Sequence, residues 1–474
     1  MQPTAIINLV GLSRSLLGPH APTLQSIVER GRVRTIRPPL PAVTTTVQSS
    51  MLTGRPVSGH GIVANGWYDR TQAEVQFWKQ SNRLVQGEKL WHVARRRDPS
   101  FTCAQMFWWY NMYADVDISV TPRPIYCADG RKLPDCHSHP PEIRDELQQE
   151  LGLFPLFRFW GPAASIESSR WIAEASLRVH ARHRPSLMMV YLPHLDYPLQ
   201  KYGPGHPAIP GEVARLDELV ARLQRELESA GVRILWLSEY GIEAVDAAAF
   251  PNRELRRAGL LQVRREQGGE LLDAGASEAF AVVDHQVAHV YVRDPQRVPA
   301  VAELLSAIPE VEQVLDQGQR EAMDIDHARS GELTLVARRG AWFAYDYWLD
   351  DARAPDFART VDIHRKPGYD PRELFLDPAR PLIKAGIAWR LLRKRLGFRA
   401  LMDVIPLDAS LVGGSHGRVE QPEAERPILI SDADLGRGGP HDAETIDATA
   451  IHDLALESIF GRPDAAGGAG TERG

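Results

Sequence analysis

The chain has 474 residues, of which 43% are hydrophobic and 24% are charged, and its formal net charge is -6. This length allows one large α/β domain with an insert, or two to three smaller units, and the composition is ordinary for a soluble globular enzyme. The mild charge gives no general electrostatic reason to bind a nucleic acid polymer or an anionic membrane. An anionic substrate would therefore need local help from a metal, an arginine or helix N-termini.

The cysteines and the N-terminus indicate a reducing compartment. Cys103, Cys127 and Cys136 are too few, and odd in number, for a disulfide framework. Cys127 and Cys136 lie near His137 and His139, but the C-x8-C spacing is not that of a usual zinc motif. The start of the chain lacks the basic residues and long apolar run of a signal peptide, and no window reaches the ~18 apolar residues of a membrane span. We therefore expect a cytoplasmic protein.

From the N-terminus, strand and helix patterns alternate. Residues 5–10 are an apolar run ended by Gly11, which is typical of a buried first strand in a parallel sheet. Residues 23–31 have helical spacing and end in glycine. Residues 36–41 are proline-rich and predict an edge strand or an extended loop. Residues 44–54 predict a short helix that begins with hydroxyl side chains.

Residues 66–165 are rich in aromatic side chains, notably over 107–110, at Tyr113 and over 157–160. We expect an insertion packed over the core, because most aromatic residues are core residues. The alternative is that these side chains form an aromatic wall of a substrate pocket.

The alternation then continues and later changes. A strand over 186–192, an amphipathic helix over 216–230 and a strand over 232–238 predict a largely parallel, layered sheet. Further along, three strands and one helix predict a compact α+β unit, and the main sheet resumes near 427–431. Those elements are expected at 287–292, 299–308 (the helix), 311–315 and 333–337.

The predicted domain organisation is a core in two parts. Residues 1–265 form the first part, with 66–165 as an insertion, and residues 346–464 form the second part. Between them, residues 266–345 form an α+β cap. Residues 465–474 are glycine-rich and predict a disordered tail.

Thr44 is the first candidate for chemistry. A hydroxyl at the start of a short helix meets the free N–H groups and the dipole of that helix, which favour an anion such as phosphate. Such a hydroxyl attacks phosphorus if a metal or a base lowers its pKa. The alternative is that Thr44 only caps the helix.

Three further polar residues stand at predicted strand ends or among glycines. Asp196 follows the strand over 186–192 and Glu239 follows the strand over 232–238, at the sheet edge where ligands of open α/β sheets bind. His416 lies in a Gly-Gly-Ser-His-Gly segment, where glycines allow close backbone approach. These three side chains suit a hard-metal site with mixed oxygen and nitrogen ligands, although loop edges are polar in any case.

The motif around Thr44 resembles a known family. Thr44 is followed by Thr53-Gly54 and then by His60-Gly-Ile-Val-Ala-Asn65. This pattern resembles the type I phosphodiesterase/nucleotide pyrophosphatase family of the alkaline phosphatase superfamily. The resemblance implies an α/β fold: a layered α/β/α core with a mostly parallel central sheet and a small inserted α+β cap. It also implies that Thr44 is the nucleophile and that Asn65 helps to bind a non-bridging phosphate oxygen, beside the backbone amide after Thr44.

Later segments extend the resemblance. Asp196 with Gly203-Pro204 resembles the family's metal-ligand aspartate, and His416 resembles its late metal-ligand histidine. Residues 311–315 and 330–336 resemble the cap of phosphonoacetate hydrolase-like enzymes.

The chain departs from the family at the metal ligands. The family's first-strand aspartate aligns with Val10, and its histidine four residues after the ligand aspartate aligns with Gln200. Its Asp-His pair after the third strand aligns with Glu239-Tyr240. A normal two-zinc site is therefore not expected.

Fewer ligands remain for a metal. At one of the family's two metal positions, the remaining ligands are Asp196 and His416, with Gln200 as a weak oxygen ligand. At the other position, the remaining ligands are Glu239 and the Thr44 hydroxyl. We expect the site to bind a divalent cation (Zn, Mn or Mg). The sequence leaves the number of ions open, and a single ion is one of the options. Other residues are candidates for recruitment, although each is more often structural than functional. These are Asn8, His194, Asp284, His285, Asp362 and His364, with Asp284 and His285 in the most tightly packed cluster.

The sequence thus predicts a metal-dependent hydrolase of phosphodiester or pyrophosphate-type bonds, acting on a small phosphorylated substrate through a phospho-threonine intermediate at Thr44. Two alternatives stay open. One is a catalytically degenerate family member that binds a phosphorylated metabolite. The other is a phosphonate or sulfate ester hydrolase, since fold does not fix function.

Overall fold

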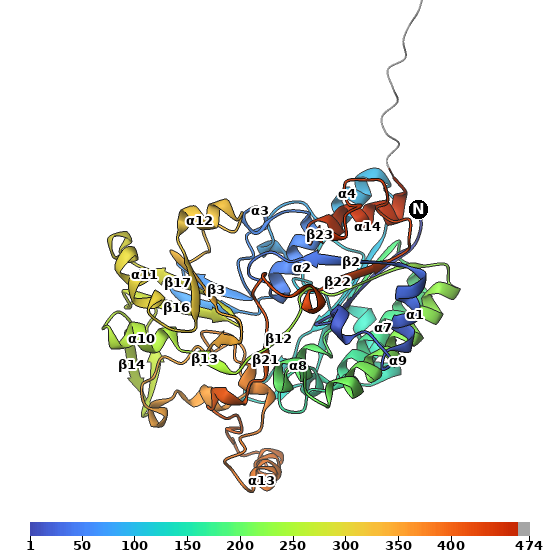
Figure 1. The fold of residues 1–474 in the computed structure, drawn as a ribbon. Coiled ribbons are helices and arrows are strands. Elements are labelled where there is room, and N and C mark those ends of the chain that lie inside the picture. The colour runs from blue at the N-terminus through green and yellow to red at the C-terminus, as the bar shows by residue number, and fades with distance from the viewer. Residues whose placement is uncertain (463–474) are drawn as a thin grey trace, which may run out of the picture.

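A computed structural model describes residues 1–462, and within that range the main sheet has nine strands (Figure 1). Strands β22 and β9 run antiparallel to their neighbours, and all other neighbouring pairs run parallel. In sheet order the strands are β23 (Thr445–Asp447), β2 (Arg32–Arg37), β22 (Ile428–Ser431), β11 (Arg233–Leu237), β1 (Thr4–Leu9), β10 (Leu187–Leu192), β5 (Cys103–Met106), β6 (Ile118–Pro122) and β9 (Cys136–His139). The predicted mostly parallel sheet is confirmed. The predicted tail of residues 465–474 lies outside the described residues.

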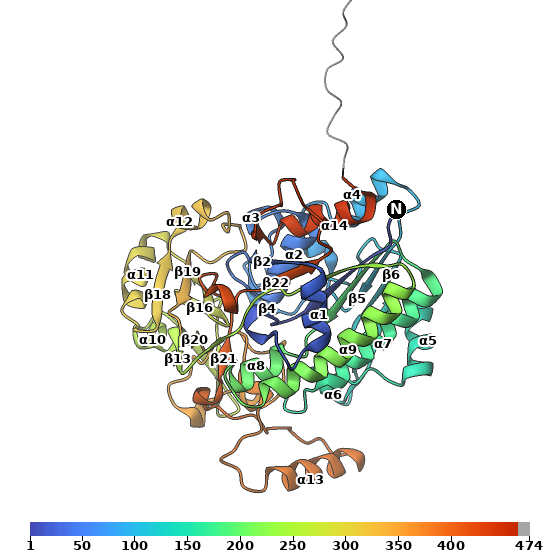
Figure 2. The same ribbon diagram turned by 45° about the vertical axis from the view of Figure 1, so that its right-hand side comes forward.

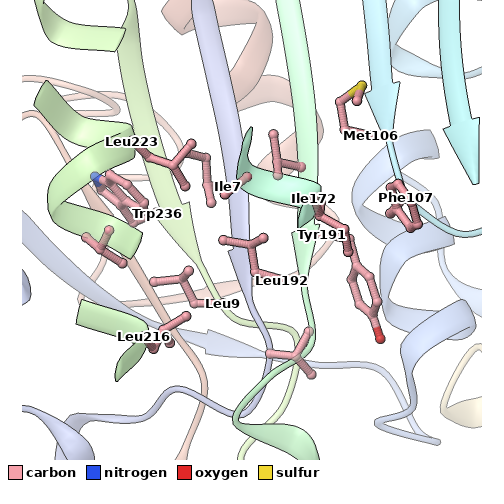
Figure 3. Close-up of a cluster of buried hydrophobic side chains, with 14 of the residues drawn as sticks. Ile7, Leu9, Met106, Phe107, Ile172, Tyr191, Leu192, Leu216, Leu223 and Trp236 are labelled. Atoms are coloured by element: carbon pink, nitrogen blue, oxygen red, sulfur yellow. The ribbon is translucent and has the colours of Figure 1, made fainter. Parts of the chain in front are cut away.

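Strand β1 shows why the sheet is buried on both faces. All of its residues are buried, and it pairs in parallel with β10 on one side and β11 on the other. Because successive side chains of a strand point to opposite faces, Ile7 and Leu9 enter one hydrophobic cluster and Ile6 enters another. Figure 3 shows the first cluster, in which Leu216 and Leu223 lie with Ile7 and Leu9.

Helices cover both faces of the sheet and complete the three-layered α/β/α arrangement (Figure 2). One face packs against α1 (Pro22–Arg30), α5 (Pro141–Leu151), α7 (Ile166–His183) and α9 (Ile209–Ser229). The other face packs against α2 (Thr44–Thr53), α4 (Leu90–Arg97) and α14 (Ala450–Phe460). Helix α9 begins earlier than the predicted residue 216, because Pro210 fits the first turn of a helix, where no backbone N–H is needed.

Residues 66–165 are not an insertion outside the core, in contrast to the sequence-based prediction. Strands β5, β6 and β9 all lie in this segment and extend the main sheet. These strands are short, and β5 is buried at every residue, so it shows no alternation of polar and apolar side chains. Within this segment, β3 (Gly66–Asp69) with β4 (Glu74–Phe77) and β7 (Ile125–Tyr126) with β8 (Lys132–Leu133) form separate two-stranded pairs.

A second unit lies beside the main sheet, at the left of Figure 1. Its antiparallel sheet has the order β16 (Ala279–Asp284), β17 (Val287–Val292), β19 (Leu333–Ala337) and β18 (Val311–Leu315), with α10 (Pro251–Arg257), α11 (Val298–Ser306) and α12 (Gln317–Ala322). The hydrophobic cluster of this unit also takes in Tyr345, Trp348 and Phe357. Its packing therefore runs past residue 345, where the predicted cap ends.

The remaining elements are short, apart from one helix. They are α3 (Val57–His60), α6 (Leu156–Phe159), α8 (Asp196–Tyr202), β12 (Glu243–Ala244), β13 (Ala247–Ala249), β14 (Val263–Glu266), β15 (Gly269–Leu272), β20 (Ala341–Phe343), β21 (Gly414–Ser415) and the longer α13 (Ile383–Arg395). Figure 2 shows α13 set apart from the rest of the fold. Among residues 1–462, none of the helices combines the length and the apolar character needed to cross a bilayer.

A buried ion cluster fixes the irregular segment after β20. The guanidinium of Arg372 binds both carboxylate oxygens of Asp346, at 2.9 and 2.7 Å, and its Nε donates to Asp370 at 2.6 Å. Lys366 Nζ donates to Asp370 at 2.8 Å and lies 2.7 Å from Glu373. The side chain of Arg372 is fully buried, so its charge is compensated only by these carboxylates.

We predict that Arg372→Met lowers the free energy of unfolding by about 3–5 kcal/mol, because the buried Asp346 loses its two-bonded partner and keeps only Arg253, at 3.5 Å. Chemical denaturation followed by circular dichroism measures the change. Arg365→Met is the control, since Arg365 forms an exposed ion pair with Asp356 and its removal is expected to cost less than about 1 kcal/mol. Equal losses in the two variants would contradict this account.

Candidate active site

Thr44 is the first residue of α2, and its hydroxyl does not cap the helix. The N-cap position belongs to Val43, which has extended backbone angles, and no side chain caps this end. The helix is buried along its whole length and ends at Gly54, whose φ of 63° is a left-handed conformation that glycine adopts without strain. Thr44 therefore lies at the buried start of α2, and its side chain does not act as a helix cap.

The hydroxyl of Thr44 begins a hydrogen-bond chain. Its Oγ1 lies 3.0 Å from the hydroxyl of Tyr240, and Tyr240 donates to Asp196 Oδ1 at 3.3 Å. A phenol has one proton, so when Tyr240 donates it to Asp196, the Thr44 hydroxyl donates to Tyr240. All three side chains are buried. The chain runs across the sheet edge at which β10 and β11 end.

Asn65 lies beside the start of α2, as the resemblance implies. Its Oδ1 accepts a hydrogen bond from the backbone N–H of Thr45 at 3.1 Å, and its Nδ2 donates to Asp284 Oδ1 at 3.1 Å. The backbone N–H of Asn65 also donates to Asp284, at 2.8 Å. The structure thus brings Asn65 and the amide after Thr44 together, and it adds Asp284 to them.

Asp284 in turn orients His285. Nδ1 of His285 lies 2.7 Å from Asp284 Oδ1, so the imidazole carries its proton on Nδ1 when it donates to this carboxylate. Nε2 of His285 has no hydrogen-bond partner within residues 1–462. Burial lowers the pKa of His285 well below its usual value, which keeps the ring neutral and Nε2 a lone-pair acceptor.

Four aromatic rings form a stack through the site. Tyr240 and His416 stack with centroids 3.6 Å apart and an interplanar angle of 6°, and His416 and His285 follow at 3.7 Å. Tyr369 closes the stack on His285 at 3.6 Å. Nδ1 of His416 bonds to the carbonyl of Ala42 at 2.8 Å, and its Nε2 faces Asp196 Oδ1 at 3.9 Å. The stack fixes the orientation of both histidines and of the Tyr240 hydroxyl.

Glu239 is fixed by amide side chains. Its Oε2 accepts from Asn8 Nδ2 at 2.7 Å and from Gln48 Nε2 at 2.9 Å, whereas its Oε1 has no hydrogen-bond partner among the described residues. Burial raises the pKa of Glu239 to about 8 and that of Asp196 to about 7. Burial also raises the pKa of Asp284 to about 6. Among residues 1–462, no cationic side chain forms a hydrogen bond with any of these three carboxyl groups.

A cavity of about 1110 Å³ opens onto these residues. Thr44, Asp196, Tyr240 and His285 line one part of it. Aromatic side chains line much of the rest, among them Trp78, Trp109, Phe157, Phe159, Trp160, Tyr191, Tyr197 and Tyr369. Trp109 and residues from 157–160 thus belong to the aromatic wall weighed as an alternative from the sequence, whereas Phe107, Trp108 and Tyr110 are buried in the core.

Of the other candidate residues, Gln200, Asp362 and His364 lie at the site or along the cavity, whereas His194 forms a separate pair. Gln200 is buried and accepts a hydrogen bond from the hydroxyl of Tyr369 at 2.8 Å. His364 lines the cavity with Asp362 and bonds through Nδ1 to the carbonyl of Phe77 at 3.3 Å. His194 pairs instead with Glu212, at 2.9 Å.

The donor set does not fit the two-metal centre that the resemblance implies. Val10 is a buried core residue with no ligand atom in its side chain, and the Tyr240 hydroxyl lies between Thr44 and Asp196, in hydrogen-bond contact with both. Residues 1–462 hold no group of three or more histidine, cysteine, aspartate or glutamate side chains arranged to bind an ion. This holds for Cys127, Cys136 and their neighbouring histidines as well.

Sequence reasoning missed the role of two residues that organise the site. Tyr240 was recognised only as a departure from a histidine, and Gln48 was not singled out. Gln48 stands one turn after Thr44 on the same helix, and it joins Glu239 to the backbone N–H of Trp109, which donates to Gln48 Oε1 at 2.8 Å. The signal for it was the polar side chain inside a fully buried helix.

His60 joins α2 to the loop that carries Asn65. Nδ1 of His60 accepts from the backbone N–H of Ile62 at 3.1 Å, so the proton lies on Nε2, which donates to Ser50 Oγ at 2.9 Å. His60 is fully buried, and burial lowers its pKa to about 3. A second proton on this ring would break the bond to Ile62 and place a charge in the core.

A family profile described as type I phosphodiesterase / nucleotide pyrophosphatase matches residues 4–370, which is more than half of the chain.

Solved structures share the fold over nearly the whole chain. An inactive variant of murine ectonucleotide pyrophosphatase/phosphodiesterase 5 in complex with AMP has a TM-score of 0.59 and 14% identity, covering 97% of this chain and 95% of that one. Phosphonoacetate hydrolase from Sinorhizobium meliloti 1021 in complex with phosphonoformate has the same TM-score and identity, covering 97% and 96%. The human ectonucleotide pyrophosphatase/phosphodiesterase 5 has a TM-score of 0.58 and 12% identity, covering 97% and 95%. At these identities the likeness concerns the fold.

We predict that His60 makes the fold sensitive to acid. Its folded-state pKa lies below the unfolded value, so it contributes stability that is present above about pH 6.5 and is lost as the pH falls toward 3. His60→Asn keeps an acceptor for Ile62 but removes the titration, so its melting temperature falls less between pH 7 and pH 4 than that of the wild type. Thermal melts at several pH values measure this, with the exposed His183→Asn as control. A wild-type slope retained in His60→Asn would be the contrary result.

Proposed function

Because the chain belongs to the type I phosphodiesterase/nucleotide pyrophosphatase family, we propose that it cleaves a phosphodiester, pyrophosphate or phosphonate bond of a small phosphorylated substrate with Thr44 as the nucleophile. The observation that carries this proposal is the hydrogen-bond chain from Thr44 through Tyr240 to Asp196, at a helix start that faces the cavity.

In the first step, Thr44 Oγ1 attacks phosphorus and the bond from phosphorus to the leaving oxygen breaks. The proton of Thr44 passes to the Tyr240 hydroxyl while the proton of Tyr240 passes to Asp196, so no charge accumulates on the threonine. The leaving group departs toward the open cavity, where water supplies its proton. Asn65 and the N–H groups at the start of α2 hold the negative charge of the phosphoryl oxygens.

In the second step, water cleaves the phospho-threonine. Nε2 of His285 takes the proton of the attacking water, and Asp284 holds the ring in the required tautomer, as the hydrogen bond to Nδ1 provides. The bond between Thr44 Oγ1 and phosphorus breaks, and Thr44 regains its proton from Asp196 through Tyr240. His285 then releases its proton to the water of the cavity as the product leaves. Both the free Nε2 and the position of His285 on the cavity wall favour this role.

The family is generally metal-dependent, and the ligand set predicted from the sequence, Asp196, Gln200, Glu239 and His416, stays a prediction for Zn, Mn or Mg. The steps above use none of these ions, because the Tyr240 hydroxyl takes the place beside Thr44. A cytoplasmic location likewise stays a prediction.

Two other functions are distinguished by turnover. A member that only binds a phosphorylated metabolite would take up the ligand without product formation. A phosphonate or sulfate ester hydrolase would cleave those esters faster than a phosphodiester, with the same residues.

We predict that Thr44→Ala lowers kcat/KM for a chromogenic phosphodiester by about 1,000-fold or more, and that Tyr240→Phe lowers it about 100-fold, mainly through kcat. The phenylalanine keeps the ring stack but has no hydroxyl to receive the proton. Tyr113→Phe, at an exposed tyrosine, is the matched control and keeps wild-type rates. Wild-type activity in Thr44→Ala would exclude Thr44 as the nucleophile, and product-free ligand binding by the wild type would favour the binding function.

We predict that turnover survives dialysis against a chelator, because the Tyr240 hydroxyl links the Thr44 hydroxyl to the Asp196 carboxylate, which can accept its proton. Elemental analysis of the protein before and after dialysis, with assays at each stage, tests this. Loss of activity on dialysis, with recovery on adding one equivalent of Zn, Mn or Mg, would instead support the ligand set predicted from the sequence.

A further inference from the structure

Residues 378–402, which carry α13, form a surface unlike the rest of the chain. No residue of α13 is buried, and Figures 1 and 2 both show the helix away from the main body. Large apolar side chains are exposed along the segment: Leu382, Trp389, Leu391, Leu392, Leu396, Phe398 and Leu401, at 80%, 60%, 53%, 47%, 64%, 60% and 53%. Side chains of this kind are normally covered when they gather in one place.

The same segment is strongly basic. Among residues 378–402 there is no aspartate or glutamate, although the whole chain has a net charge of -6. Arg380 and Arg390 pair with Asp403, just outside the segment. The other basic side chains make no ion pair with any residue from 1 to 462: Lys384, Arg393, Lys394, Arg395 and Arg399.

Helix α13 has two apolar faces with different roles. Ile387 and Leu391 line the cavity, one turn apart. Trp389, Leu392 and Leu396 follow a second line at helical spacing, and none of them lines the cavity. The first face therefore extends the cavity that leads to Thr44, and the second is left open to the surroundings.

We propose that residues 378–402 dock the protein on an anionic lipid bilayer, with Trp389, Leu392 and Leu396 entering the interface. The unpaired basic side chains that do not line the cavity, Lys384, Arg393 and Arg399, contact the headgroups. The outward face of α13 sets Trp389, Leu392 and Leu396 beside basic side chains, and a membrane interface accommodates both kinds of group. The positive charge of the segment is complementary to an anionic membrane surface. The net charge of the whole chain is -6, so the rest of the protein surface is expected to be repelled by such a membrane.

The docked segment places the cavity at the membrane. Leu401 and Met402 line the cavity together with the inner face of α13, and Thr44 lines it further along. A lipid phosphate ester fits this path, with its phosphate at Thr44 and its apolar part along the aromatic and aliphatic wall. This second part of the inference rests on the proposed function, since it needs Thr44 to act on a phosphate ester.

Other partners match the segment less well. A nucleic acid would use the basic side chains but would leave the apolar ones in water, since phosphates carry its affinity. A second copy of this chain would cover the apolar side chains but would bring two basic segments together. Only a surface that is both anionic and apolar satisfies both kinds of side chain.

Co-sedimentation of the full chain with vesicles of phosphatidylcholine, with and without phosphatidylserine, tests the docking. We expect binding to the anionic vesicles that weakens with salt and is absent on phosphatidylcholine alone. The double variant Trp389→Glu/Leu392→Glu lowers the fraction bound about tenfold, and so does the triple variant Lys384→Gln/Arg393→Gln/Arg399→Gln. Matched controls keep wild-type binding: Leu153→Glu, at a side chain 60% exposed, and Arg225→Gln/Arg265→Gln, at exposed arginines.

Several results would overturn the docking. These are no binding to anionic vesicles at low salt, binding unchanged in Trp389→Glu/Leu392→Glu, or a dimer in sedimentation equilibrium that the same variant abolishes. Tighter binding to an oligonucleotide than to vesicles would also overturn it. Thr44→Ala must bind vesicles as the wild type does, so docking is measured independently of turnover.

The substrate part is tested with nitrophenyl alkyl phosphodiesters of increasing chain length. We expect kcat/KM to rise with chain length in the wild type, and the rise to shrink in Leu391→Ser, which alters the cavity wall. Turnover without a preference for longer chains would overturn the lipid substrate and leave the proposed hydrolase standing. No turnover of any ester would overturn the proposed function itself, while the vesicle result would stand.

Discussion

The site depends on one interaction, the contact of the Tyr240 hydroxyl with both Thr44 and Asp196. A hydroxyl group is both donor and acceptor, so it joins the Thr44 hydroxyl to a carboxylate through two hydrogen bonds. The substitution of tyrosine for the histidine of the resembled family therefore alters the chemistry available to Thr44 and leaves its position at the helix start unchanged.

That contact is held by the packing around it. The stack of Tyr240, His416, His285 and Tyr369 fixes the ring planes, and each ring belongs to a different segment of the chain. Burial raises the pKa of the nearby Glu239 and Asp196, so both favour their protonated forms more than exposed carboxyl groups do. Protonation of these carboxyl groups therefore lowers the electrostatic repulsion among them, and also their repulsion of the anionic substrate proposed for the cavity.

Local patterns in the sequence were sufficient for some parts of the molecule and not for others. The spacing from Thr44 to Asn65 lies within one short stretch, and the strand and helix patterns around β1, β10 and β11 are long and apolar. Strands β5 and β6 were missed because short strands buried on both faces have no alternating pattern. Strand β9 is a four-residue edge strand in which only Cys136 and Ser138 are buried. The function of Tyr240 was missed for another reason: its partners, Thr44 and Asp196, come from distant segments, and only tertiary packing brings them together.

The order of strands in the main sheet bears on how the chain is made. Strand β22 lies between β2 and β11 in the sheet, although it follows both of them in the sequence. While a ribosome is still synthesising residues 238–427, β2 and β11 lack the neighbour that separates them, and each presents an unpaired edge. Open strand edges invite pairing with other chains. The newborn protein is consequently exposed to aggregation until both β22 and β23 (Thr445–Asp447), the two neighbours of β2, leave the exit tunnel, and molecular chaperones have their greatest opportunity to act in that interval.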